Sequence, residues 1–164
     1  MHDIAAAAGV TQSLIHHHFG AKDALWRDVR RDAVLAYHER IEAAFAASDG
    51  PSRAVMADLF AHLAEEPHLM RLVAWVELEG EAVSLGCPTA LACIAEAQAR
   101  GRVRADVSAA HLLTAFLGVV RTWFADRNLV ADESDAEGLR KTDAAYLDAA
   151  WSVFSRGAVD QGPV

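Results

Sequence analysis

The chain has 164 residues, a net charge of −8, 53% hydrophobic residues and only four prolines. This length is sufficient for a buried core, and the hydrophobic content excludes an intrinsically disordered chain. Abundant alanine, leucine, arginine and glutamate favour helices, so the predicted fold class is all-α.

The sequence also bears on cellular location and cofactors. Its apolar runs are much shorter than the ~20 residues that a membrane helix needs, and no signal-peptide pattern follows Met1. Cys87 and Cys93 stand six residues apart and match no metal or redox motif. We therefore expect a cytoplasmic protein with reduced thiols and neither cofactor nor metal ion.

Charge is distributed unevenly along the chain. Residues 1–32 contain four basic and four acidic side chains, so the whole net charge of −8 lies in residues 33–164. A neutral N-terminal part on an acidic body is compatible with DNA binding through that part alone, although no strongly basic patch supports it.

In chain order, glycines and helix caps divide the sequence into helices. Gly9 ends a short helix over residues 3–8, Thr11 caps a second that runs to residue 19, and Gly20 precedes a long helix over 22–47. Further helices are expected over 52–64, 67–79, 88–100, 109–128 and 143–156, with Pro67 in the first turn of its helix. Residues 80–88 and the polar stretch 131–141 are expected to be connections.

The first two helices have the pattern of a helix-turn-helix. Such helices cross closely, which suits the small residues Ala5 and Ala8, and their turn often needs a glycine, here Gly9. Val10 and Ile15 are expected to fill the angle between the helices. The start of the second helix would then face the major groove of DNA. The alternative is an ordinary helical hairpin.

This segment resembles the TetR family of bacterial transcriptional regulators. The resemblance rests on Asp3-Ile4-Ala5, Ala8-Gly9-Val10, Thr11-Gln12-Ser13, His18-Phe19 and Lys22. The rest of the chain resembles the family only in architecture, and the predicted fold is a helix-turn-helix head followed by a helical bundle. The resemblance places the head and connecting helix in residues 1–46 and the ligand-binding and dimerisation domain in 47–164.

The resemblance also implies roles for residues of the head. Gln12, Ser13 and His16 would contact bases, while Thr11, His17 and Lys22 would contact phosphates. His16 stands where the family usually has tyrosine, which alters the expected contact. His18 and Phe19 would support the fold.

The family places one more helix before this segment, and the head is expected to be incomplete without it. Ile4, Ile15 and Phe19 would then lose a covering partner and expose apolar surface. A start codon assigned too late, a trimmed chain and a natural truncation all account for the difference, and we favour the first two.

The family's body usually contains a pocket for a small effector. We expect the lining to come from the helices at 52–64, 67–79 and 109–124, although plain core is the preferred interpretation of each apolar residue taken singly. The expected apolar lining residues are Phe60, Leu63, Leu72, Trp75, Phe116 and Trp123, and the expected polar anchors are Arg71, Glu79 and Arg121. Such a lining indicates an apolar or aromatic effector.

The last two helices carry apolar residues in adjacent pairs, which gives each helix two apolar faces. One face would be buried within the bundle and the other against a second copy of the chain; the alternative buries both within one bundle. The expected dimer residues are Leu113, Leu117, Val120, Phe124, Leu147, Trp151 and Phe154.

Three other patterns are set aside. His16, His17 and His18 are consecutive, so they point about 100° apart on a helix and cannot converge on one metal ion. Glu65 and His68 form a single Glu-x-x-His, whereas di-iron bundles need two. Cys87 before Pro88 could act as a redox switch, but an inert thiol is the preferred interpretation.

No nucleophile–base pattern or phosphate-binding glycine loop is present, so we do not expect an enzyme. The predicted function is a ligand-responsive transcriptional regulator, a repressor that binds a palindromic operator as a homodimer and is released by a small effector. The alternative is a dimeric small-molecule-binding protein that has lost DNA binding.

Overall fold

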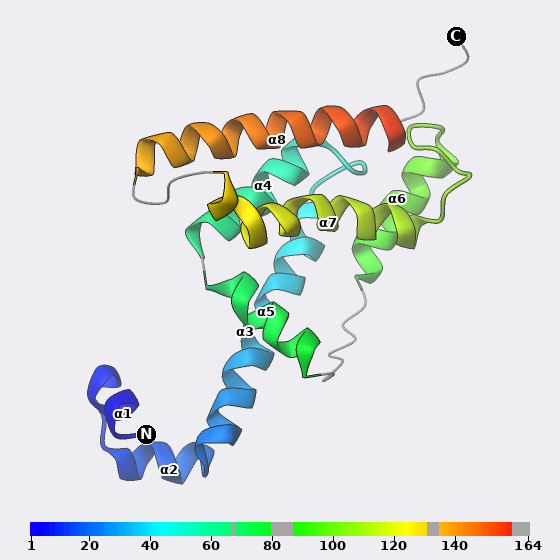
Figure 1. Ribbon diagram of the computed structural model, residues 1–164. Helices are drawn as coiled ribbons and strands as arrows, with labels where there is room; N and C mark the ends of the chain where they lie inside the picture. Colours follow the sequence, from blue (N-terminus) through cyan, green and yellow to red (C-terminus); the bar gives the residue numbers. More distant parts are fainter. Residues whose placement is uncertain (67, 80–86, 131–134, 159–164) are drawn as a thin grey trace.

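The computed structural model describes residues 1–66, 68–79, 87–130 and 135–158, and these residues form α-helices without any strand (Figure 1). The helices are α1 (His2–Ala8), α2 (Gln12–Phe19), α3 (Lys22–Ala46), α4 (Arg53–Glu65), α5 (Leu69–Leu78), α6 (Pro88–Ala99), α7 (Ala109–Asp126) and α8 (Ala136–Ala158), with a 3₁₀ turn at Arg127–Leu129 after α7. The all-α prediction is confirmed.

Several helices begin at a local hydroxyl cap, as predicted for Thr11. The side chain of Thr11 accepts a hydrogen bond from the Leu14 N–H, at 3.2 Å, and starts α2. Ser52 and Ser108 begin α4 and α7 in the same way. These contacts satisfy amide groups that a helix leaves unpaired in its first turn.

The largest difference from an expected boundary lies at the last helix. The last helix begins at Ala136 rather than near residue 143, because Asp135 accepts hydrogen bonds from the N–H groups of Glu137 and Gly138. Ion pairs from Glu137 to Arg140 and Lys141 then stabilise a stretch that its polarity assigned to a loop. The helix expected from residue 67 is described from Leu69; Pro67 and most of the connection at 80–88 lie outside the described residues.

The short helices α1 and α2 form a head that stands apart from the other helices, and α3 runs from this head into the body (Figure 1). The second half of α3 presents Val34, Tyr37, Ile41 and Phe45 to the core. Its packing partners are α4, α5 and α6. One continuous helix therefore carries the head and forms part of the core of the body.

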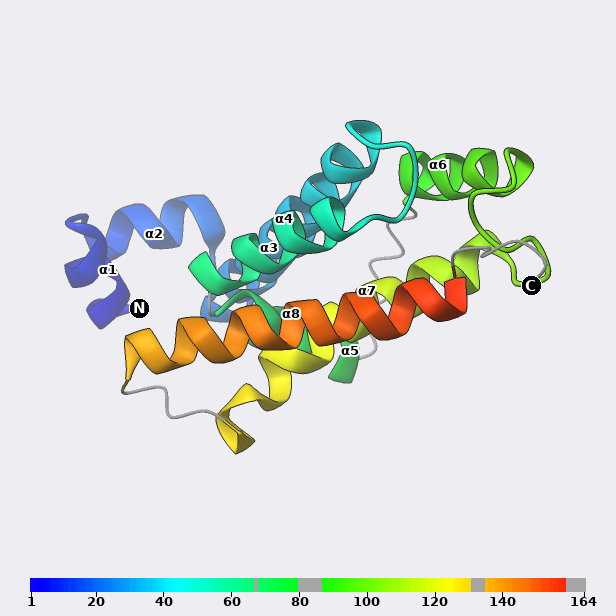
Figure 2. The same ribbon diagram turned by 90° about the horizontal axis from the view of Figure 1, so that it is seen from above.

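The centre of the body is a set of fully buried apolar side chains. Phe45 and Phe116 pack edge to face, with ring centroids 5.6 Å apart, and Met56, Leu59 and Leu63 of α4 are completely buried. α8 lies alongside α7 and also packs against α4 (Figure 2). Within the described residues, no helix combines the length and apolarity needed to cross a bilayer.

Candidate nucleic-acid interface and effector pocket

The turn between α1 and α2 depends on Gly9, which has a φ of 66°. A side chain is strained in this left-handed conformation, so glycine is favoured there. Ala5 and Ile15 are buried where α1 and α2 pack together, as expected. The same expectation was wrong for Ala8 and Val10, which remain exposed.

The residues predicted to contact DNA lie on α2 and on the first turn of α3, at the end of the molecule farthest from α8 (Figure 1). Every one of them is exposed: Thr11, Gln12, Ser13, His16, His17 and Lys22. Leu14 is also exposed, at 43%, and sequence reasoning did not select it. Its signal was an apolar residue within a polar stretch, and apolar side chains can contact the methyl group of thymine.

His16 is held by two hydrogen bonds of its ring. Nδ1 lies 2.8 Å from the carbonyl oxygen of Gly20, and Nε2 lies 3.3 Å from Nε2 of Gln12. The imidazole therefore has a defined position on α2, beside a residue predicted to contact bases.

Apolar side chains are exposed on the head, as expected for Ile4 at 38% and Phe19 at 39%. Ile15, in contrast, is only 6% exposed because it is enclosed between α1 and α2. Val10, Leu14, Trp26 and Val29 extend the exposed apolar surface.

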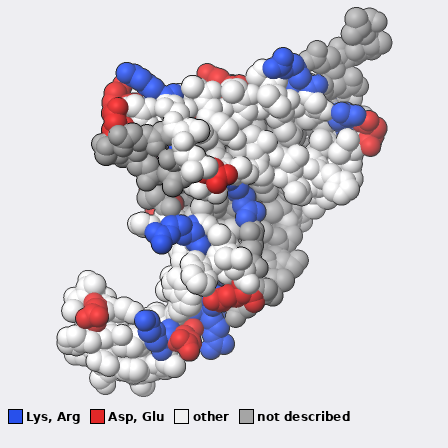
Figure 3. All heavy atoms as spheres, in the orientation of Figure 1, with Lys and Arg blue, Asp and Glu red and all other residues white. Residues whose placement is uncertain are grey.

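The electrostatic character of the head follows its neutral sequence. Most of its surface in Figure 3 is uncharged, and basic and acidic side chains lie together where the head meets α3. Farther along α3, Arg31 forms ion pairs with Asp28 and Asp32. Attraction to phosphates in this region would depend mainly on a few cations, such as Lys22.

In the body, four of the predicted pocket residues are part of the packed core. Phe60, Leu63, Phe116 and Trp123 are buried. Trp123 stacks on Tyr146 with ring centroids 4.2 Å apart. The residues Phe60 and Phe116 also contact other aromatic rings.

The other predicted lining residues belong mainly to α5 and differ in environment. Leu72 is half-buried, whereas Arg71 and Trp75 are exposed. Glu79 directly follows α5 and forms an ion pair with Arg30 of α3. The Glu79 carboxylate therefore makes a contact within the fold.

A cavity of about 400 Å³ lies between α5 and α7. Its volume falls within the range of small-molecule sites, roughly 300–1,000 Å³. Arg121 is the predicted pocket residue that lines it, and the complete lining is Met70, Ala74, Thr114, Leu117, Gly118, Arg121, Thr122 and Ala125. The cavity thus lies between two of the helices that the sequence indicated, but mostly uses other residues.

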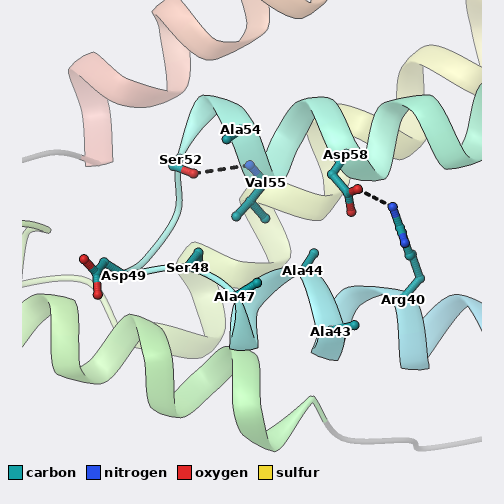
Figure 4. Close-up of a pocket in the computed structure, with 10 residues that line it drawn as sticks. All are labelled: Arg40, Ala43, Ala44, Ala47, Ser48, Asp49, Ser52, Ala54, Val55 and Asp58. Carbon is teal, nitrogen blue, oxygen red and sulfur yellow. Dashed lines mark hydrogen bonds and ion pairs between the residues drawn. The ribbon is translucent and has the colours of Figure 1, made fainter.

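A second cavity, of about 500 Å³, lies between the end of α3 and the start of α4 (Figure 4). Several alanines line it, and its polar side chains already have partners within the chain. Arg40 pairs with Asp58, Asp49 pairs with Arg102, and Ser52 caps α4. We favour the α5–α7 cavity as the candidate effector site, because it lies between two of the helices from which the sequence predicted the lining.

Two protein-family models match the chain, one over the head and one over the body. A model of the bacterial regulatory proteins of the tetR family matches residues 1–29, and a tetracyclin repressor-like C-terminal domain matches residues 55–150. The chain belongs to the TetR family. Its general role is therefore that of a ligand-responsive transcription regulator, and neither family description names an enzyme. No curated protein matches the chain.

For this TetR-family chain, the residues predicted at a dimer interface divide into two groups. Leu113, Val120 and Phe154 are buried in the chain's own core, so they have little surface left for a partner. The other four are only partly buried: Leu117, Phe124, Leu147 and Trp151. Val153, 69% exposed on α8, was not selected although it belongs to an apolar pair.

His38 and Glu42 of α3 approach the start of α6. Burial and the charge of Arg121 lower the pKa of His38 below its ordinary value of 6.5. Burial raises the pKa of Glu42, but hydrogen bonds from Thr89 and Ala90 outweigh this effect and lower it overall. The carboxylate accepts hydrogen bonds from the backbone N–H groups of Thr89, at 2.8 Å, and Ala90, at 3.1 Å.

Cys87 lies beside this pair of residues, with its sulfur 3.6 Å from Nδ1 of His38. Burial and the charge of Glu42 raise the pKa of the Cys87 thiol. Because the thiolate is the reactive form, this environment disfavours the redox-switch alternative. Among the described residues, no group of three or more histidine, cysteine or carboxylate side chains could hold a metal ion.

Proposed function

We propose that the chain is a repressor that binds a palindromic operator as a homodimer and releases it when a small effector binds the body. The observation that carries this proposal is the head, in which α2 exposes Gln12, Ser13 and His16 at the end of the molecule farthest from α8 (Figure 1). A helix placed in this way can enter the major groove without the body obstructing it.

Within the head, residues divide by their expected contacts with DNA. Gln12 and Ser13 would contact base edges, because they lie at the start of the second helix of the motif. Thr11, His17 and Lys22 would contact phosphates. Lys22 lies in the first turn of α3, where unpaired backbone N–H groups also attract anions.

The proposed effector binds in the cavity between α5 and α7. Its lining is mainly apolar or small, with Arg121 as a charged side chain. A mainly apolar or aromatic molecule would match this lining. Because α5 also packs against α3, an effector that displaces α5 would move the helix that carries the head.

The proposed homodimer uses the outer faces of α7 and α8. Trp151 and Val153 of α8 retain exposed surface there, and exposed alanines of α8 would allow close approach of a second copy. Two heads held about 34–36 Å apart would match successive half-sites on one side of the duplex. The two-fold symmetry of such a dimer would match the two-fold symmetry of a palindromic operator.

DNA binding can be tested by fluorescence anisotropy with a duplex from the promoter neighbouring the gene and a scrambled duplex of equal length. We expect tighter binding to the promoter duplex, with affinity falling as salt increases. Lys22→Ala should weaken binding to both duplexes. It should also reduce the salt slope, which is the steepness with which log K falls with log salt concentration, by about 1. Gln12→Ala should reduce the preference between them by about fivefold or more.

Lys141→Ala is the matched control, because this second lysine lies exposed on α8, away from the head. It should leave both the affinity and the salt slope unchanged. Equal affinity for the two duplexes would contradict the proposal. If the chain then also formed a dimer and melted at a higher temperature with a small molecule, the alternative of a dimeric ligand-binding protein would be supported.

The dimer is tested by sedimentation velocity. Val153→Glu places a charge on the exposed face of α8 and should shift the chain to a monomer, whereas Asp148→Glu on the same helix should not. A monomeric wild-type chain at micromolar concentration would contradict this part of the proposal.

A further inference from the structure

The side chains of Gln12 and His16 form a short hydrogen-bonded chain that ends at the backbone of Gly20. These two residues lie one helical turn apart on α2, and both are exposed. Nδ1 of His16 is 2.8 Å from the Gly20 carbonyl oxygen, which can only accept a hydrogen bond. The imidazole must therefore carry a proton on Nδ1.

This proton determines the roles of the other atoms. A neutral imidazole has one N–H, so Nε2 of His16 is then an acceptor. The neighbouring atom, 3.3 Å away, is the amide nitrogen of Gln12, which can only donate. The bond therefore fixes the orientation of the Gln12 amide and leaves its oxygen and one N–H available for other partners.

We infer that His16 is a positioning residue that orients the Gln12 amide to recognise an adenine in the operator. An acceptor beside a donor matches the major-groove edge of adenine, which offers its N6 amino group and N7. This inference rests on the proposed DNA-binding function. It assigns His16 an action through Gln12 rather than a base contact of its own.

Protonation of His16 reverses this arrangement. Nε2 then carries a proton and faces the N–H of Gln12, so two donors oppose each other. Rotation of the amide brings the Gln12 oxygen to the imidazolium and leaves only N–H donors for DNA. Such a group matches the acceptors O6 and N7 of guanine. Because histidine changes charge between about pH 5 and 8, the base preference should depend on pH.

Other ionisable groups of the head are distinct from this hydrogen-bonded chain. The helices that pack against α2 carry His2 and Asp3 on α1 and Lys22 and Asp23 at the start of α3. His17 and His18 lie on α2 itself and contact each other through their rings. The hydrogen bonds of the His16 ring run to Gln12 and Gly20. Substitution of His16 alone therefore leaves these other groups in place.

The test is selection of bound duplexes from a random library by the full chain at about pH 8 and about pH 6. Four forms are compared: wild type, Gln12→Ala, His16→Phe and the double variant. At the higher pH, wild type should enrich adenine at one position by about fivefold or more, and each single variant should lose this preference at that same position. The double variant should lose no more than either single variant.

At the lower pH, the wild-type preference should move from adenine toward guanine, and His16→Phe should show no such shift. His16→Asn provides a second variant that keeps a polar side chain but does not titrate, and it too should show no shift. Circular dichroism checks that each variant folds.

Losses at different base pairs, or additive losses in the double variant, would show that His16 makes its own contact and would overturn the inference. A preference that stays constant with pH would also overturn it. If wild type enriched no sequence at all, the proposed function itself would fail, which is a separate result.

Discussion

The guanidinium of Arg30 forms an ion pair with the carboxylate of Glu79, which joins α3 to the end of α5. The Arg30 side chain is only 4% exposed and also lies over the ring of Trp26, whereas Glu79 is 36% exposed. The pair thus connects the helix that carries the head to a helix that lines the α5–α7 cavity.

Glu79→Ala should destabilise the protein, because it removes the carboxylate that faces a buried arginine. Breaking a buried pair costs about 3–5 kcal/mol, but the partial exposure of Glu79 reduces the expected loss to about 1–3 kcal/mol. Urea unfolding measures this loss. Asp28→Ala is the control, since its pair with Arg31 is exposed and should contribute less than about 0.5 kcal/mol. Equal losses in the two variants would contradict the prediction.

A second prediction concerns Trp123, whose indole N–H donates to Asp143 at 2.7 Å. Arg127 lies 3.7 Å from the same carboxylate, and both charged side chains are nearly buried. Asp143→Ala removes the acceptor of a buried N–H, so we expect a loss of about 2–4 kcal/mol in the free energy of unfolding. Asp143→Asn keeps an acceptor for the indole and should lose less.

Asp148→Ala is the matched control for this prediction. Asp148 lies on α8, as Asp143 does, and pairs with Arg53 of α4, but both side chains of this pair are more than half exposed. The loss in the free energy of unfolding should therefore stay below about 1 kcal/mol. Tryptophan fluorescence during urea unfolding reports on all three variants. A loss in Asp143→Ala no larger than in Asp148→Ala would contradict the assigned role.

The features that the sequence predicted correctly depend on neighbouring residues. Gly9 ends α1 and Thr11 caps α2, because a turn or a cap needs only a few adjacent residues. Local signals also located the head and its exposed polar residues. The stretch 136–141 was misassigned because its polarity conceals a cap from Asp135.

The features that the sequence did not predict depend on residues that are distant along the chain. Glu79 was expected to anchor a ligand but pairs with Arg30, 49 positions away. Phe60 and Phe116 were expected in a pocket but pack against aromatic rings of other helices. An apolar helical residue has the same sequence pattern whether it lines a cavity or fills a core, so only the packing of the helices distinguishes the two.

The third prediction concerns pH and His38. Burial and Arg121 lower the pKa of His38 in the folded chain, so the unfolded chain binds the proton more readily below the ordinary value of 6.5. Stability should therefore be highest above that value and decrease as the pH falls through it. Glu42, with a lowered pKa, contributes in the same direction but below its own ordinary value of 4.5.

This pH dependence is measured as the urea midpoint between about pH 8 and about pH 6. The midpoint of the wild type should fall over this interval, and that of His38→Gln should fall less, because the titrating group is absent. His111→Gln removes an exposed histidine of α7 and serves as the control. If His38→Gln kept the full wild-type dependence, another group would be responsible.

The last prediction concerns the cap of α6. Cys87 at its N-cap position makes no side-chain cap hydrogen bond, and Pro88 at the next position has no N–H to donate. The carboxylate of Glu42 on α3, 47 positions before Thr89, takes the place of a local cap. It accepts hydrogen bonds from the backbone N–H groups of Thr89 and Ala90. Its negative charge also lies at the positive end of the helix. We expect Glu42→Ala to cost about 1–2 kcal/mol in the free energy of unfolding.

Glu42→Gln separates the two contributions, because it keeps an oxygen acceptor but removes the charge, so its loss should be smaller than that of Glu42→Ala. Glu39→Ala is the matched control, since Glu39 is an exposed glutamate on the same helix. Urea unfolding followed by circular dichroism compares the three variants. A Glu42→Ala loss equal to that of Glu39→Ala would mean that α6 forms without this cap, and α3 would then hold α6 through apolar packing alone.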